Sequence, residues 1–218
     1  MDPELAVLAG TAGTTLVTLL TTEAWQRVSD GITSLWRRAE PARAEAISAE
    51  LDVTRTDLLA ARDGGDLQVG SELGAEWQGR IRRLLVTHPE EAAALLATGP
   101  AVIADCISAT GEDHPMTLGA ELNYAFTLSA MGRPAEALPH ARRALTGYER
   151  LFTPDYPLLL NARQNLSVAL HALGRHAEAI EQGEILVDGR IRVLGPAHPW
   201  TVHAEELLHE YRNAARSS

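Results

Sequence analysis

The residues of this chain that could do acid–base, nucleophilic or metal chemistry are eight histidines and one cysteine, Cys106. His171 and His176 flank a predicted turn, and no histidine has metal-ligand spacing with a cysteine or with paired carboxylates. Cys106 precedes Asp113 and His114, a set that would suit an activated nucleophile. A lone cysteine in an apolar helix is more often a small core residue. The sequence therefore predicts no metal site and no catalytic residue.

Several classes of function are disfavoured by what the chain lacks. A phosphate-binding glycine loop ends in Lys-Ser or Lys-Thr, and all 19 basic residues here are arginine. There is no Gly-x-Ser-x-Gly nucleophile elbow either. A net charge of −10 argues against a nucleic-acid partner, which needs a basic surface. One cysteine permits no internal disulfide. We expect a non-enzymatic, cytoplasmic protein without a cofactor.

The second half of the chain repeats itself. Prolines recur at a constant spacing of 42 residues, at Pro115, Pro157 and Pro199. The same offset relates two further groups of residues in the first repeat to their equivalents in the second. These are Met131-Gly132-Arg133 with Leu173-Gly174-Arg175, and Ala135-Glu136-Ala137 with Ala177-Glu178-Ala179. A fixed period of this length indicates stacked supersecondary units.

Each repeat is predicted to be a pair of helices. Proline suits the first position of a helix, and it pushes the residue before it out of the helical conformation. Gly132 and Gly174 suit the turn between two helices, where a positive φ is often needed. Ala137 and Ala179 are small enough for two helices to cross closely.

These residues resemble the tetratricopeptide repeat family, and within it the longer kinesin-light-chain-like subtype. The resemblance rests on three stretches of the first repeat, three of the second and the start of a third. They are His114–Leu118, Asn123–Ala125 and Gly132–Ala137; then Asn165–Ser167, Leu170 and Gly174–Ala179; then Leu194–Thr201. Leu159 and Leu207 depart from the family pattern. The third repeat stops after its first helix, as a terminal capping helix would.

The resemblance implies a partner and a binding face. First helices of each pair line the concave face in this family, and the peptide-contacting positions fall on nine residues here. They are Leu122, Asn123, Phe126 and Ser129, then Asn161, Gln164, Asn165, Val168 and His171. Asn123 and Asn165 would either grip a peptide backbone or bond the neighbouring helix, since an amide both donates and accepts. We expect an adaptor for a protein or peptide partner in bacterial signalling or regulation.

The first half opens with an uncharged run, Leu5–Thr22, inside a helix predicted over 3–37. Three interpretations stay open for this run. It is a helix buried against other helices, a segment that associates with a membrane or self-assembles into a homo-oligomer, or a disordered stretch. Gly10 and Gly13 would allow close backbone approach in the first two cases. The membrane or self-assembly interpretation gives an alternative function, in which the repeats act as a sensor.

The remaining segments complete an all-α fold. Apolar or small residues spaced three and four apart predict a coiled-coil type αα-hairpin over 41–86. A short helix over 89–97 and a connecting segment over 98–112 follow. The short helix completes an N-terminal helical region, 1–97. The connecting segment leads into the repeats, 113–218. There we expect a short α-solenoid of two helix pairs and a capping helix.

Overall fold

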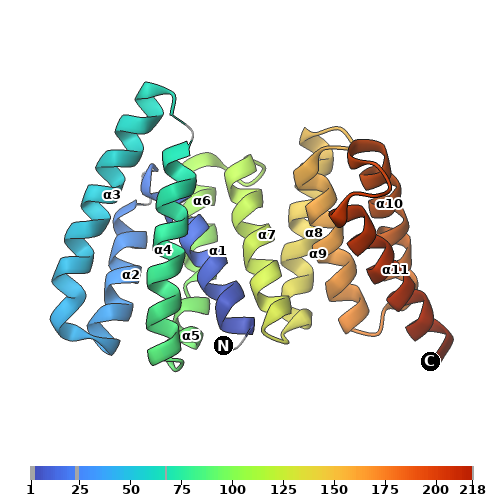
Figure 1. Ribbon diagram of the computed structural model, residues 1–218, viewed down its shortest axis with the longest axis horizontal. Coiled ribbons are helices and arrows are strands. Elements are labelled where there is room, and N and C mark those ends of the chain that lie inside the picture. The colour runs from blue at the N-terminus through green and yellow to red at the C-terminus, as the bar shows by residue number, and fades with distance from the viewer. Residues whose placement is uncertain (1–2, 23–24, 67, 218) are drawn as a thin grey trace. The chain divides into compact units, whose positions relative to one another are not determined.

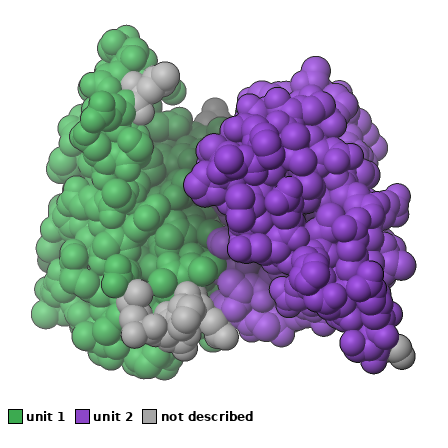
Figure 2. Space-filling view, turned by 45° about the vertical axis from the view of Figure 1, so that its right-hand side comes forward, with its two compact units in different colours: residues 1–120 green, residues 121–218 purple. Residues whose placement is uncertain are grey.

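The computed structural model describes residues 3–22, 25–66 and 68–217. In these ranges every regular element is a helix, which confirms the all-α class. The chain divides into two compact units, Met1–Ala120 (unit 1) and Glu121–Ser218 (unit 2), coloured separately in Figure 2. This boundary lies later in the chain than the connecting segment predicted over 98–112.

Unit 1 is built from six α-helices and one short 3₁₀ helix among its described residues (Figure 1). They are α1 (Pro3–Leu20), α2 (Trp25–Ala39), η1 (Pro41–Arg43), α3 (Ala44–Gly64), α4 (Gln68–Thr87), α5 (Glu91–Leu96) and α6 (Gly99–Thr110). α1 packs mainly against α4. Leu16, Leu19 and Leu20 of α1 are almost fully buried. The uncharged run is therefore a packed helix of unit 1, as in the first of its three interpretations.

The start of the chain differs from the single helix predicted over 3–37. α1 ends at Leu20, and a separate helix, α2, begins at Trp25. The hydroxyls of Thr21 and Thr22 donate to the carbonyls of Thr18 and Leu19, at 3.1 and 2.7 Å. Threonine side chains that bond nearby carbonyls offer the backbone an alternative to continuing the helix. Gly31 lies inside α2 without ending it.

The segment 41–86 forms two helices, with partners that a heptad pattern cannot specify. The predicted seam of α3 is buried at Ile47, Leu51 and Leu58. However, α3 packs mainly on α2, and α4 mainly on α1. Trp77 of α4 joins these layers, because its Nε1–H donates to Thr54 of α3 at 3.0 Å and its ring meets Trp36 of α2 edge-on. The two helices thus belong to a bundle rather than to an isolated hairpin.

The predicted connecting segment over 98–112 is mostly the helix α6. By length and composition alone, the stretch Glu91–Thr110 could cross a membrane. Its two acidic residues are tied to α2, however. Arg38 binds Glu91 and Arg27 binds Asp105, each with a nitrogen–oxygen distance of 2.7 Å. Glu91 and Asp105 are both buried, so these pairs fix α5 and α6 within unit 1.

The repeat segment has five helices (Figure 1), and the first of them crosses the boundary between the units. They are α7 (Pro115–Ala130), α8 (Pro134–Leu151), α9 (Pro157–Ala172), α10 (His176–Leu194) and α11 (Pro199–Ser217). The three repeated prolines each begin a helix, as predicted. Gly132 and Gly174 have positive φ, at 69° and 73°. After each glycine, the next backbone N–H reaches back to Leu128 or Leu170, the pattern of a Schellman turn.

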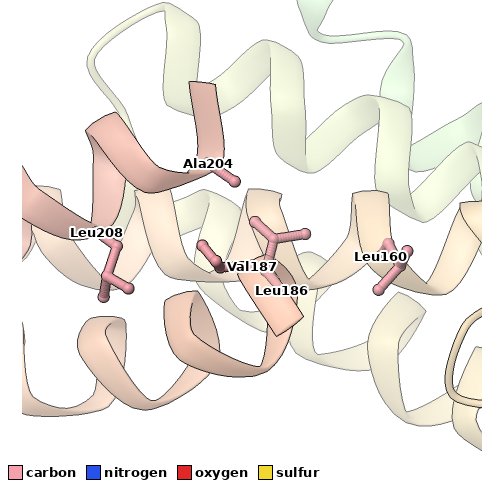
Figure 3. Packing of buried hydrophobic residues seen from close by; sticks show 5 residues of the cluster. All are labelled: Leu160, Leu186, Val187, Ala204 and Leu208. Atoms are coloured by element: carbon pink, nitrogen blue, oxygen red, sulfur yellow. The ribbon is translucent and has the colours of Figure 1, made fainter. Parts of the chain in front are cut away.

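The core of unit 2 joins its last three helices. α9 and α11 both pack on α10. Figure 3 shows the buried side chains Leu160 of α9, Leu186 and Val187 of α10, and Ala204 and Leu208 of α11. Because α11 covers the exposed side of the second pair, it acts as the capping helix that the sequence predicts.

Candidate functional site

The predicted binding residues of α7 and α9 lie around two small hollows in unit 2. The first hollow, of about 240 Å³, is lined by Leu122, Asn123, Phe126, Asn161, Gln164 and Asn165. The second, of about 130 Å³, is lined by Phe126, Ser129, Ala130, Gln164, Asn165 and Val168. We call the residues around these two hollows the α7–α9 face. The 42-residue register therefore brings together every predicted position except His171.

The apolar part of this face is graded in depth. Leu122 is only 7% exposed, whereas Phe126 is 42% exposed. Phe126 borders both hollows, and Val168, half-buried, borders the second. The face thus offers an exposed aromatic ring beside a buried aliphatic floor, the arrangement that binds an apolar side chain.

The polar part consists of amide side chains and the hydroxyl of Ser129. Nδ2 of Asn165 donates to the carbonyl of Leu122, at 3.4 Å, which is long for such a bond. This contact matches the interpretation in which the asparagine bonds the neighbouring helix. Oδ1 of Asn165 has no partner among the described residues, and neither has the amide of Asn161. Polar groups therefore remain available in the first hollow.

The amide of Gln164 is held from behind by Arg190 of α10. Oε1 of Gln164 accepts from Nη2 of Arg190 at 2.6 Å, and Nη1 of Arg190 donates to the carbonyl of Trp200 at 2.7 Å. Arg190 is 4% exposed, and this burial lowers the pKa of its guanidinium. Sequence reasoning missed Arg190. The signal was its register, because the repeat offset puts it at the position of the buried Tyr148.

His171 lies apart from the two hollows, in a cluster between the end of α9, the start of α10 and the middle of α11. Its Nδ1 is 3.2 Å from Nδ1 of His176, and its Nε2 is 3.4 Å from a carboxylate oxygen of Glu210. Its ring also lies against Tyr211. Within the described ranges no three His, Cys, Asp or Glu side chains are grouped to hold a metal ion.

Cys106 is a buried thiol of α6 rather than an activated one. It is 1% exposed. Burial, with a smaller effect from Asp105, raises the pKa of the thiol to about 11. A nucleophilic cysteine needs a lowered pKa, because the thiolate is the reactive form. Cys106 is therefore a small core residue, as expected.

Unit 1 contains an apolar pocket of about 540 Å³ between α1, α2, α5 and α6. Small residues leave this space open, among them Ala12 of α1, Gly31 of α2 and Ala101 of α6. The Arg27–Asp105 ion pair borders it. No sequence pattern pointed to this pocket.

Comparison with known families gives one match. Residues 116–188 match the family model Tetratricopeptide repeat. The resemblance to that family is confirmed for this segment. The match spans α7, α8, α9 and most of α10, which include the helices of the α7–α9 face, and it ends before Arg190. Tetratricopeptide repeats generally mediate protein–protein interactions and are typically non-enzymatic. No curated protein matches the chain.

Proposed function

We propose that the α7–α9 face binds an extended peptide segment of a partner protein, without catalysing a reaction. The observation that carries this proposal is the pair of adjoining hollows, in which the exposed ring of Phe126 stands beside unpaired polar groups of Asn161 and Asn165. An extended peptide offers a carbonyl and an N–H at every residue. Amide side chains can accept from one and donate to the other.

The repeat subtype, the localisation and the role in signalling are proposed from the sequence. The 42-residue period and the repeated His-Pro starts at His114 and His198 support the kinesin-light-chain-like subtype. The proposal places the protein in the cytoplasm, as an adaptor in signalling or regulation. The alternative, in which Leu5–Thr22 binds a membrane or self-assembles, would require α1 to leave α4. Burial of Leu16, Leu19 and Leu20 opposes that release.

The test begins with a ligand selected in vitro. The full chain is immobilised, a random library of 12-residue peptides is selected against it, and the tightest peptide is labelled for fluorescence anisotropy. The double variant Asn123→Ala with Asn165→Ala should weaken binding by about 10- to 100-fold, since each lost hydrogen bond is worth about 1 kcal/mol.

The matched control is Asn213→Ala, an exposed asparagine of α11 that lines neither hollow. It should bind like the wild type. Circular dichroism checks that all variants stay folded. Equal affinity of the double variant and the wild type, or failure to select any peptide that competes for this face, would overturn the proposal.

A further inference from the structure

Arg190 is a buried cation whose partners are neutral. It is 4% exposed, and its guanidinium donates to the side-chain oxygen of Gln164 and to the main-chain oxygen of Trp200. Among the described residues no carboxylate lies within ion-pair distance of it. A buried charge without a counter-charge costs free energy, so proteins usually pair such groups.

The two repeats show that the fold does not require this polar pair. The 42-residue offset places Gln164 at the position of Leu122, and Arg190 at the position of Tyr148. Leu122 is 7% and Tyr148 is 1% exposed, so both belong to the buried interior of the first repeat. In the first repeat these two positions hold a leucine and a buried tyrosine. In the second repeat both positions hold a polar residue.

The contact with Arg190 decides which end of the Gln164 amide is available. Arginine only donates, so the atom facing it must be the amide oxygen. That leaves Nε2, which has no partner among the described residues. Gln164 lines both hollows, so its free donors are the groups that it can offer there. The positive charge behind the amide also strengthens those donors in a setting of low dielectric.

We infer that Arg190 is a positioning residue, which fixes the Gln164 amide so that the α7–α9 face receives an acceptor oxygen of the peptide at Nε2. This inference rests on the proposed function. A main-chain carbonyl and a side-chain carboxylate share the required chemistry. A ligand group that can only donate a hydrogen bond is rejected at Nε2 of Gln164, because two donors would then face each other without an acceptor.

The key variant is Gln164→Glu, which has almost the same shape. Its carboxylate pairs with Arg190 and replaces the free donors with an acceptor oxygen. The variant should therefore be more stable than the wild type in thermal unfolding, yet bind the selected 12-residue peptide at least tenfold more weakly. A second variant, Arg190→Tyr, copies the first repeat and should also weaken binding, by releasing the amide.

Gln182→Glu is the matched control. Gln182 of α10 also accepts from an arginine, Nη1 of Arg163 at 2.8 Å, but lines neither hollow. This change should alter stability without changing peptide affinity. Simple stabilisation of the fold would affect both glutamate variants alike, so the difference between them isolates the role of the amide in binding.

Changes in the peptide separate the two sources of the acceptor. Replacing each acidic residue of the peptide by its amide weakens wild-type binding if a carboxylate is received. Replacing single main-chain carbonyls by thioamides, which accept more weakly, does so if a main-chain carbonyl is received. In either case the sensitive peptide position should become insensitive in Gln164→Glu.

The outcomes also separate this inference from the proposed function. If the Asn123 and Asn165 double variant loses binding while Gln164→Glu binds as tightly as the wild type, peptide binding stands and the role of Arg190 is wrong. If neither variant changes affinity, both are wrong. Equal affinity of Arg190→Tyr and the wild type would also overturn the positioning role.

Discussion

Two glycines of α1 give a direct test of how this helix is used. An alanine Cβ at Gly13 would lie 2.6 Å from the backbone nitrogen of Gln78 and 2.9 Å from its Cα. An alanine Cβ at Gly10 would meet nothing within 4 Å. Both glycines are interior to the same helix. Gly13→Ala and Gly10→Ala therefore differ in packing against α4, and hardly at all in helix propensity.

The size of the effect follows from these distances. An alanine in place of a glycine inside a helix gains about 1 kcal/mol in either variant. At position 13, ordinary contact with the Gln78 backbone would require α1 and α4 to separate by roughly 0.9 Å, since heavy atoms pack at about 3.5 Å and the shorter backbone contact is 2.6 Å. Overpacking of this kind costs about 1–3 kcal/mol. Two of the contacted atoms, N and Cα of Gln78, belong to the backbone, so rotation of the Gln78 side chain cannot relieve the clash.

We expect Gly10→Ala to raise the free energy of unfolding by up to about 1 kcal/mol. Gly13→Ala should fall below it by about 1–3 kcal/mol. Urea unfolding of the full chain, followed by circular dichroism and tryptophan fluorescence, measures this difference. If the two variants unfold with the same free energy, α1 does not pack on α4 through Gly13. The interpretation of Leu5–Thr22 as a membrane or self-assembly segment would then regain support.

Two further predictions follow from buried groups. At Gly189 an alanine Cβ would lie 2.6 Å from Cδ2 of Leu160, the rotatable end of a side chain. The clash in Gly189→Ala should therefore lower the free energy of unfolding by less than the backbone clash in Gly13→Ala does. In the control Gly31→Ala the added Cβ meets nothing within 4 Å, so this change should raise the free energy of unfolding. For Cys106, burial raises the thiol pKa from 9.0 to about 11, so the unfolded chain loses this proton at a lower pH than the folded chain. The stability that this thiol contributes is complete below pH 9 and is lost between pH 9 and about 11. Urea titrations should show a larger loss over that range for wild type than for Cys106→Ala, and equal losses would contradict the raised pKa.

Local signals in the sequence were enough to place the helices of the repeats. Pro115, Pro157 and Pro199 begin helices for steric reasons that act within a few residues, and Gly132 and Gly174 end them in the same way. In unit 1 no proline or glycine marks the break after Leu20, where the hydroxyls of Thr21 and Thr22 bond the carbonyls of Thr18 and Leu19. A heptad pattern, likewise, identifies the buried face of a helix but not its partner.

The boundary between the units shows the same limit. The sequence repeat begins at Pro115, yet the first turns of α7 belong to unit 1. Thr117 is fully buried there, and its hydroxyl donates to the carbonyl of Gly111 at 2.7 Å. A repeat in sequence marks a repeated local structure. Where one compact unit ends depends instead on which residues are packed together.

The candidate site separates what a repeat can predict from what it cannot. Equivalence between repeats placed Asn123 and Asn165 at matching positions of α7 and α9, because the register carries over from one helix to the next. The same equivalence would predict an apolar residue at 190, since Tyr148 is buried in the first repeat. Gln164 and Arg190 depart from the pattern of the first repeat. Burying this polar pair costs free energy, and the first repeat has Leu122 and Tyr148 at the same positions instead. We therefore propose that this departure at the edge of a hollow serves the bound peptide, in addition to the contact of Arg190 with Trp200 of α11.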